Sequence, residues 1–127
     1  MGGGYLNLNQ IASAKTIFNR VIQVEPKNYY ALVNLGDIAF HLEKNYVQAA
    51  NYFSRCLDTK SPDYFKTYSN LAASYLMQNQ TDKAIENYEN ALRYGSSPSV
   101  LNNLYSLWKS KGNQEKMEYY QSLINKK

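Results

Sequence analysis

The chain has 127 residues, of which 44% are hydrophobic, and a formal net charge of +4 at pH 7. No apolar run approaches the roughly 20 residues needed to span a bilayer, so we expect one soluble unit without a membrane span. Lysine and arginine are scattered among acidic residues, so the basic total alone does not indicate a nucleic-acid-binding protein. The single cysteine, Cys56, excludes an internal disulfide and is expected to pack as a small hydrophobic residue.

The N-terminal residues Met1-Gly2-Gly3-Gly4 are not followed by the basic and long apolar regions of a secretory signal. This favours a cytoplasmic protein, although the sequence assigns no compartment. The glycine run also lacks the Gly-Lys-Ser/Thr that completes a phosphate-binding loop, so we predict no nucleotide site there.

Taken in chain order, four segments carry small residues between aromatic and aliphatic neighbours at matching spacings. The first, incomplete copy contains Tyr5, Ala14, Phe18, Val21 and Pro26. The second contains Leu32, Leu35, Gly36, Ala39, Tyr46, Ala49, Phe53, Cys56, Leu57 and Pro62. The third contains Tyr68, Leu71, Ala72, Tyr75, Ala84, Tyr88, Ala91 and Leu92. A degenerate fourth contains Leu101, Leu104, Trp108, Gly112, Met117 and Ile124. Matching positions lie 33 to 36 residues apart, which is the period of helical repeat arrays.

Apolar positions three or four residues apart within each copy indicate helices rather than strands. We expect seven helices, at Gln10–Val24, Asn28–Leu42, Tyr46–Asp58, Pro62–Met77, Asp82–Tyr94, Pro98–Ser110 and Gln114–Asn125. Ser61-Pro62 and Ser97-Pro98 each place a capping hydroxyl before a proline and predict helix starts. Gly95 is predicted to end a helix in the left-handed conformation, and Asn79-Gln80-Thr81 and Gly112-Asn113 predict short turns.

Small residues at matching positions are expected to let adjacent helices approach closely. They are Ala14, Gly36, Ala49, Ala72, Ala84 and Ala91. Large side chains such as Phe53 and Tyr88 would fill the space around them. Most tyrosines, including Tyr46 and Tyr75, therefore fall on core positions, which argues against a stacking platform for single-stranded nucleic acid.

The pattern from Leu35-Gly36 to Leu57, and its echo from Leu71-Ala72 to Leu92, resembles the tetratricopeptide repeat over essentially the whole chain. The resemblance implies an all-α, right-handed helix-turn-helix solenoid of about three and a half repeats. We expect a single domain, 1–127, divided into a partial repeat 1–27, repeats 28–61 and 62–97, and a closing repeat 98–127. One extra residue around Leu42 to Tyr46, and one fewer near the end of the third copy, are expected to lie in turns.

No constellation of residues indicates catalysis, a cofactor, a metal site or a small-molecule substrate, so we predict that the chain is not an enzyme. The only histidine, His41, has no partner at metal-ligand spacing and is expected at the surface or in a groove. A dyad of Cys56 and His41 would join a buried position to an exposed helix end, which repeat geometry disfavours.

The resemblance implies a protein-interaction scaffold in which the first helix of each repeat lines a concave groove for a peptide or partner protein. Groove candidates lie opposite the packing positions: Tyr30, Asn34, Asp37, Lys66, Asn70 and Asn103. Each asparagine comes one residue before Leu35, Leu71 or Leu104, so one amide recurs at the same level of three repeats. Amides donate and accept, which suits an extended peptide backbone. Asparagine is also abundant here and fills exposed helix positions without a ligand.

Two alternatives remain at the sequence level. The first is nucleic-acid binding through the basic C-terminal helices, which carry Lys109, Lys111, Lys116, Lys126 and Lys127. The second is a chaperone-tail carboxylate clamp, a branch of the same family, for which Asn34 and Lys66 match. Gly3 stands where that clamp has an asparagine, and Asn70 replaces its arginine.

The first complete helix has no partner helix before it, so Ile11, Ala14, Phe18 and Val21 are expected to leave apolar surface open. Repeat arrays protect their ends with polar caps. We therefore expect either a fragment of a longer array or a homo-oligomer formed through the N-terminal end.

Overall fold

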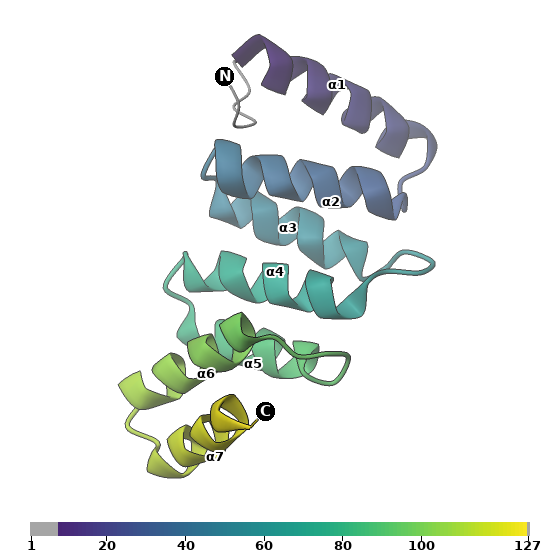
Figure 1. The fold of residues 1–127 in the computed structure, drawn as a ribbon. Helices are drawn as coiled ribbons and strands as arrows, with labels where there is room; N and C mark the ends of the chain where they lie inside the picture. The colour runs from purple at the N-terminus through teal and green to yellow at the C-terminus, as the bar shows by residue number, and fades with distance from the viewer. Residues whose placement is uncertain (1–7, 127) are drawn as a thin grey trace. The chain divides into compact units, whose positions relative to one another are not determined.

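The structure, a computed structural model, describes residues 8–126, and this part of the chain is built from helices without strands (Figure 1). Its elements are α1 (Leu8–Val24), α2 (Tyr29–Asp37), the π-helical turn η1 (Ile38–Leu42), α3 (Tyr46–Cys56), α4 (Tyr64–Leu76), α5 (Thr81–Ala91), α6 (Pro98–Ser110) and α7 (Gln114–Asn125). The predicted all-α class and seven main helices are confirmed. Gly3 and Tyr5 lie outside the described residues.

The chain forms two compact units, residues 1–62 and 63–127. The division falls within one residue of the expected repeat boundary at 61/62. In the N-terminal unit α1 packs against α2, and α2 packs against α3; in the C-terminal unit α4 pairs with α5, α5 meets α6, and α6 pairs with α7. Short turns join the paired helices, so each pair is antiparallel, as Figure 1 shows.

The core of the N-terminal unit confirms the predicted role of small residues. Leu32, Leu35 and Phe53 are buried together with Cys56, the free cysteine. A Cβ atom added to Gly36 would lie only 2.5 Å from the Phe53 ring. Since atoms cannot approach that closely, glycine at position 36 lets α2 rest directly on this ring.

The core of the C-terminal unit uses alanine for the same purpose. Ala72, Ala84 and Tyr88 belong to one buried cluster with Leu104 and Tyr120. Ala72 and Ala84 are fully buried, so the helices meet there without space for a larger side chain. Tyr75 and Trp108 are half-buried and pack against the cluster rather than within it.

The turn between paired helices repeats with the same geometry three times. Lys44, Asn79 and Gly112 have φ angles of 53°, 59° and 73°, and each immediately precedes a helix N-cap. In two turns the N-cap N–H donates to the carbonyl five residues earlier: Gln80 to Tyr75 and Asn113 to Trp108. In the first, Asn45 donates instead to Ala39, six residues earlier, at 2.8 Å.

That difference locates the extra residue of the second repeat. The expectation that it lies in the turn is wrong, because the turn is unchanged and the additional residue widens the preceding helix into η1. Glu43 N–H bonds to the Ile38 carbonyl, five residues earlier, at 3.0 Å. Such a single π turn is how an α-helix accommodates one inserted residue.

Two predicted helix ends also need correction. Helix α4 begins at Tyr64 and is capped by Asp63, whose carboxylate accepts from Lys66 N–H, so Ser61-Pro62 does not start it. Gly95 does not adopt a left-handed φ. The lack of a side chain at Gly95 instead allows close contact with Phe65, because a Cβ there would lie 3.0 Å from the Phe65 ring. Ser97 does cap α6, as predicted, by accepting from Val100 N–H.

Candidate functional site

The predicted groove residues of the N-terminal unit share one face of α2. Tyr30, Asn34 and Asp37 are spaced three and four residues apart, so they lie along one side of the helix. Tyr30 is 72% exposed, whereas Asn34 and Asp37 are half-buried. The Phe18 ring of α1 lies edge-to-face with the Tyr30 ring, with 6.5 Å between ring centroids.

The other three predicted groove residues lie in the C-terminal unit. Lys66 and Asn70 are one turn apart on α4, the first exposed and the second half-buried. Asn103 lies on α6 and is half-buried. The face of α2 and the faces of α4 and α6 thus belong to different units.

Two of the three asparagine amides already make bonds within their own unit. Asn34 Nδ2 donates to the Tyr30 carbonyl oxygen at 2.7 Å, and Asn103 Nδ2 donates to the Tyr88 hydroxyl at 3.1 Å. Burial raises the pKa of Tyr88, and the bond from Asn103 partly opposes that shift. Since an amide has a second N–H and a carbonyl oxygen, each side chain keeps capacity for a further bond.

The side chains that could act in catalysis or bind a metal lie apart from one another. His41 is exposed in η1 against the Phe40 ring, with 4.7 Å between ring centroids, while Cys56 is fully buried. Within residues 8–126, no group of three or more His, Cys, Asp or Glu side chains could hold a metal ion. None of the helices described here has the length and apolar character needed to cross a bilayer.

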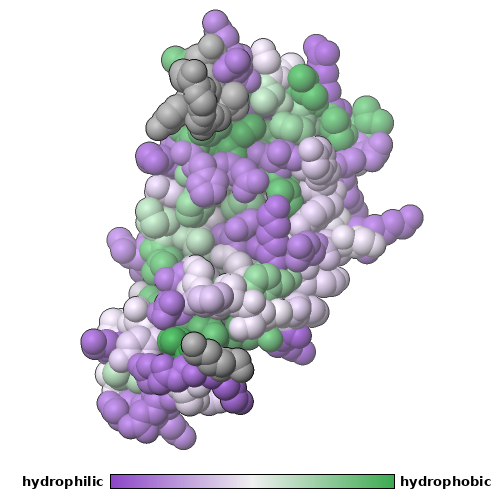
Figure 2. All heavy atoms as spheres, viewed as in Figure 1, coloured by the Kyte–Doolittle hydropathy of each residue, from purple (hydrophilic) through white to green (hydrophobic). Residues whose placement is uncertain are grey.

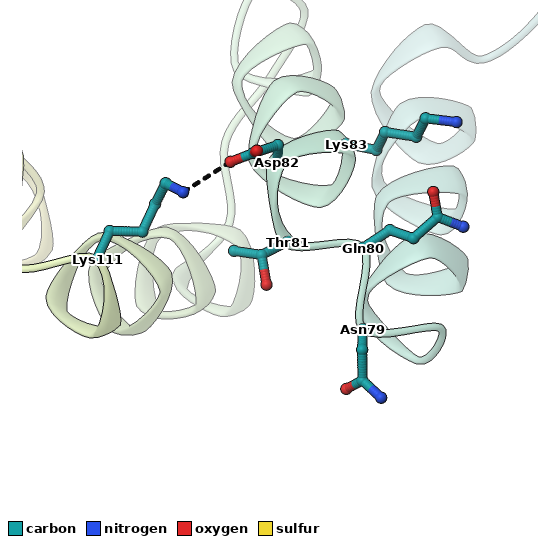
Figure 3. A pocket seen from close by; sticks show the side chains of 6 residues that line it. All are labelled: Asn79, Gln80, Thr81, Asp82, Lys83 and Lys111. Carbon is teal, nitrogen blue, oxygen red and sulfur yellow. Dashed lines mark ion pairs between the residues drawn. The ribbon is translucent and has the colours of Figure 1, made fainter.

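A pocket of about 410 Å³ opens beside the start of α5 (Figure 3). Its lining residues are Asn79, Gln80, Thr81, Asp82, Lys83 and Lys111. Asp82 and Lys111 form an ion pair across it at 2.7 Å. The lining offers no paired acid and base or activated nucleophile, so the pocket provides no catalytic arrangement.

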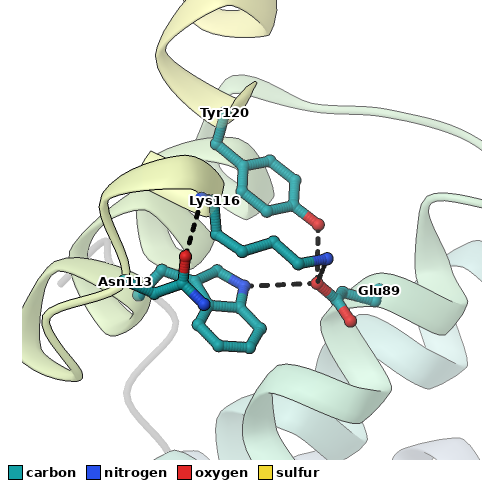
Figure 4. A network of polar contacts seen from close by, with 5 residues as sticks. Glu89, Asn113, Lys116 and Tyr120 are labelled. Carbon is teal, nitrogen blue, oxygen red and sulfur yellow. Dashed lines mark hydrogen bonds and ion pairs between the residues drawn. The ribbon is translucent and has the colours of Figure 1, made fainter. Parts of the chain in front are cut away.

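A polar network that the sequence did not predict holds the last helix in place (Figure 4). The Glu89 carboxylate accepts from the Tyr120 hydroxyl at 2.7 Å and from Trp108 Nε1 at 3.2 Å. Lys116 Nζ lies 3.7 Å from the same carboxylate oxygen and 5.3 Å from the Trp108 ring centroid. Burial, followed by the Glu89 carboxylate, raises the pKa of Tyr120 above its ordinary 10.0. The predicted closing repeat is therefore anchored by charge-assisted bonds.

A second feature missed by the sequence is a group of tyrosines, Tyr64, Tyr68 and Tyr94, which we call the tyrosine cluster. Ring centroids are 4.8 Å apart for Tyr64 and Tyr94, and 6.0 Å apart for Tyr68 and Tyr94. The three ring planes are within 24° of one another. The spacing of Tyr64 and Tyr68 by one helical turn was a visible signal, but Tyr94 joins them only through the fold.

Paired helices, repeated turns of one geometry and interlocking small residues define the class: an all-α helical-repeat protein. The family comparison agrees. The sequence model of the tetratricopeptide repeat matches residues 28–94, and a second model of the same description matches residues 5–28. The chain belongs to the tetratricopeptide repeat family.

Individual relatives give the same result. The chain is similar to the tetratricopeptide repeat-containing protein trd-1 of Caenorhabditis elegans, with 31% identity over 85 residues. That match covers 66% of this chain but only 11% of the relative, so the chain spans a small part of that protein's length.

Solved structures support the fold alone. A crystal structure of MamA superposes with a TM-score of 0.77 at 15% identity, covering 95% of this chain and 76% of MamA. A MamA double mutant gives 0.78 at 18% identity, covering 93% of this chain and 66% of that one. The tetratricopeptide repeat is generally a protein-interaction module without catalysis of its own.

Proposed function

We propose that this protein binds extended segments of a partner protein on the exposed faces of its first helices, α2 in the N-terminal unit and α4 and α6 in the C-terminal unit. The observation that carries the proposal is the recurring amide. Asn34, Asn70 and Asn103 are half-buried and each directly precedes a buried leucine of the same helix. Amides held at repeated positions suit the repeating donors and acceptors of a peptide backbone.

The neighbouring side chains add selectivity to this proposal. Tyr30 offers a large exposed ring, while Asp37 and Lys66 offer opposite charges at separate points of the faces. A partner segment with an apolar side chain near Tyr30 fits better than a uniformly charged one. The basic C-terminal segment supports nucleic-acid binding less well, because Lys111 and Lys116 are paired with Asp82 and Glu89.

The test is selection of peptides from a random display library on the immobilised protein, followed by affinity measurements with variants. Asn34→Ala/Asn70→Ala should weaken the selected peptides by about tenfold, the effect of losing roughly 1.4 kcal/mol. The matched control is Asn51→Ala/Asn87→Ala on the second helices α3 and α5. Asn87 makes the same bond to the carbonyl four residues earlier that Asn34 makes. Equal affinity in both double variants would show that Asn34 and Asn70 do not contribute to peptide binding.

Self-association through the N-terminal end is a separate proposal. Helix α1 has no buried residue. The four predicted residues, Ile11, Ala14, Phe18 and Val21, are half-buried, while Leu8, Ile17 and Val24 are more than half exposed. Figure 2 shows hydrophobic atoms at the surface over this helix. Sedimentation velocity at rising concentration should show a heavier species, and Ile17→Glu should suppress it; a constant monomer mass would contradict the proposal.

A further inference from the structure

Helix α1 repeats the sequence pattern of α3 and α5 but is covered less completely. Three of its positions recur at 35-residue steps in the two later helices. They are Ala14, Phe18 and Val21 in α1, then Ala49, Phe53 and Cys56 in α3, and Ala84, Tyr88 and Ala91 in α5. The residues of α3 and α5 are at most 3% exposed, whereas those of α1 are half-buried. Positions that belong to the core elsewhere in the chain are therefore partly open in α1.

In α3 and α5 the cover comes from the helix that precedes each of them in the chain. Helix α2 packs on α3, and α4 packs on α5. Both covering helices carry a leucine followed by a small residue, at Leu35-Gly36 and Leu71-Ala72. The small residue is needed because a Cβ at Gly36 would lie 2.5 Å from the Phe53 ring. Within residues 8–126 no helix precedes α1, which packs on the helix that follows it.

The uncovered side of α1 is a stripe of apolar side chains. Ala14, Ile17, Val21 and Val24 follow one another at intervals of three and four residues, so they share one side of the helix, which we call the open face of α1. Ile17 is 59% exposed and Val24 is 81% exposed. Ile22, about 140° around the helix from Ile17, packs instead against buried residues of α2 and α3. A stripe with this spacing is the surface that a second helix packs against.

A second copy of the chain offers a poorer cover for this face than a partner helix does. The helices α2 and α4 of that copy already cover its own α3 and α5. Its α1 contains Lys15 and Arg20 but no acidic residue. Arg20 is exposed beside Ile17 and Val24 and forms no ion pair within residues 8–126, so pairing two α1 helices would bring two cationic helices together. A helix from a partner protein has neither restriction.

We propose that the open face of α1 binds an amphipathic helix of a partner protein that carries leucine followed by glycine or alanine, as α2 and α4 do. The small residue would lie over Phe18, as Gly36 lies over Phe53. The apolar side chains around it would bury Ile17 and Val21 and remove their surface from water. This helix would displace the second copy in the self-association proposed above, but its binding does not depend on that association.

The experiment measures fluorescence anisotropy of a labelled peptide that copies residues 28–42 of this chain, titrated with the full chain. Saturable binding is expected for the wild type. Ile17→Glu should weaken it by about tenfold, because the variant places a charge in the middle of the apolar contact. The matched control, Gln23→Glu, adds the same charge at an exposed position of α1 about 120° around the helix and should leave the affinity unchanged.

A change in the peptide tests the fit without altering the protein. Gly36→Leu makes the peptide more apolar and a better helix former, so non-specific adhesion would strengthen. Loss of the small residue over Phe18 should instead weaken binding by about tenfold. The full chain with Asn34→Ala/Asn70→Ala should bind the original peptide as the wild type does, which separates the open face of α1 from the proposed peptide-binding faces.

Four outcomes would overturn the proposal. The first is the absence of saturable binding to the wild type, and the second is undiminished affinity of the Gly36→Leu peptide. Wild-type affinity in Ile17→Glu would place the peptide away from α1. Loss of binding in the asparagine variant would place it on the proposed peptide-binding faces instead. All four are independent of the sedimentation result, because anisotropy reports the bound peptide and not the mass of the chain.

Discussion

In both units small buried residues let neighbouring helices approach closely. The units differ in how their outer helices, α1 and α7, are attached. In the N-terminal unit, α1 lies over α2 and contributes no buried residue of its own. In the C-terminal unit, α7 inserts Tyr120, which is 3% exposed, and ties its hydroxyl to Glu89 on α5. Specific aromatic and charged side chains thus tie α7 to the preceding helix pair, whereas α1 packs on α2 without a buried residue.

The most severe test of this comparison removes the ring on which α2 rests. Phe53→Ala should lower the free energy of unfolding by about 3–5 kcal/mol, because it leaves a cavity beneath Gly36. Hydrogen exchange should show the loss of protection in α2 and α3. If α6 and α7 lose protection equally, the two units do not respond separately and the comparison fails.

Breaking the anchor of the last helix should have the next largest effect. Glu89→Ala leaves the Tyr120 hydroxyl and Trp108 Nε1 without their acceptor and should cost about 1–3 kcal/mol. Urea unfolding monitored by the single tryptophan measures it. Glu86→Ala, on the exposed side of the same helix, is the control and should change stability little. Equal effects in the two variants would show that the network does not hold α7.

Alkaline pH should act on the Tyr120 contact that distinguishes α7 from α1. Burial and Glu89 raise the pKa of Tyr120 above 10.0, so the folded state holds its proton more tightly than the unfolded state does. This stabilisation is complete below pH 10 and is lost as pH rises through the raised pKa of the folded protein. Tyr120→Phe should cost about 1 kcal/mol at neutral pH and reduce the alkaline loss of melting temperature. An unchanged alkaline slope in Tyr120→Phe would assign the dependence to other groups.

The smallest effect concerns the turn that both units share. Lys44 pays a steric penalty for its positive φ that Gly112 does not, so Lys44→Gly should stabilise the protein by about 0.5–1 kcal/mol. Asn79→Gly should gain less, because asparagine tolerates this conformation better. Thermal melting of the single variants ranks the three turns. Destabilisation by Lys44→Gly would show that the lysine side chain contributes more than its backbone costs.

Most of the fold followed from sequence because it depends on local rules. The 3.6-residue periodicity and the recurring small positions predicted seven helices, and the bounds of α6 and α7 were correct to the residue. Errors arose where two rules competed locally. Ser61-Pro62 and Asp63 both satisfy capping rules, and the fold uses the aspartate. Gly95 fits a left-handed helix end, yet contact with Phe65 explains it.

The candidate site was less accessible to the same reasoning. Periodicity placed Tyr30, Asn34 and Asp37 on one side of a helix, since that requires only helix geometry. It could not show that Asn103 bonds to Tyr88 or that Tyr94 joins Tyr64, because those contacts form between residues that are distant in sequence. Glu89 was unremarkable as a surface glutamate until α7 brought Tyr120 and Lys116 to it.

The π turn at Ile38–Leu42 shows how a helical repeat can accept the insertion of one residue. An insertion in the loop would have altered the turn, and one in the second helix would have displaced every buried side chain after it. Here the added residue is absorbed in a single widened coil, so Ala49 and Phe53 keep their buried positions. The π turn at the end of this first helix thus accommodates a longer repeat while the buried positions of the following helix α3 stay unchanged.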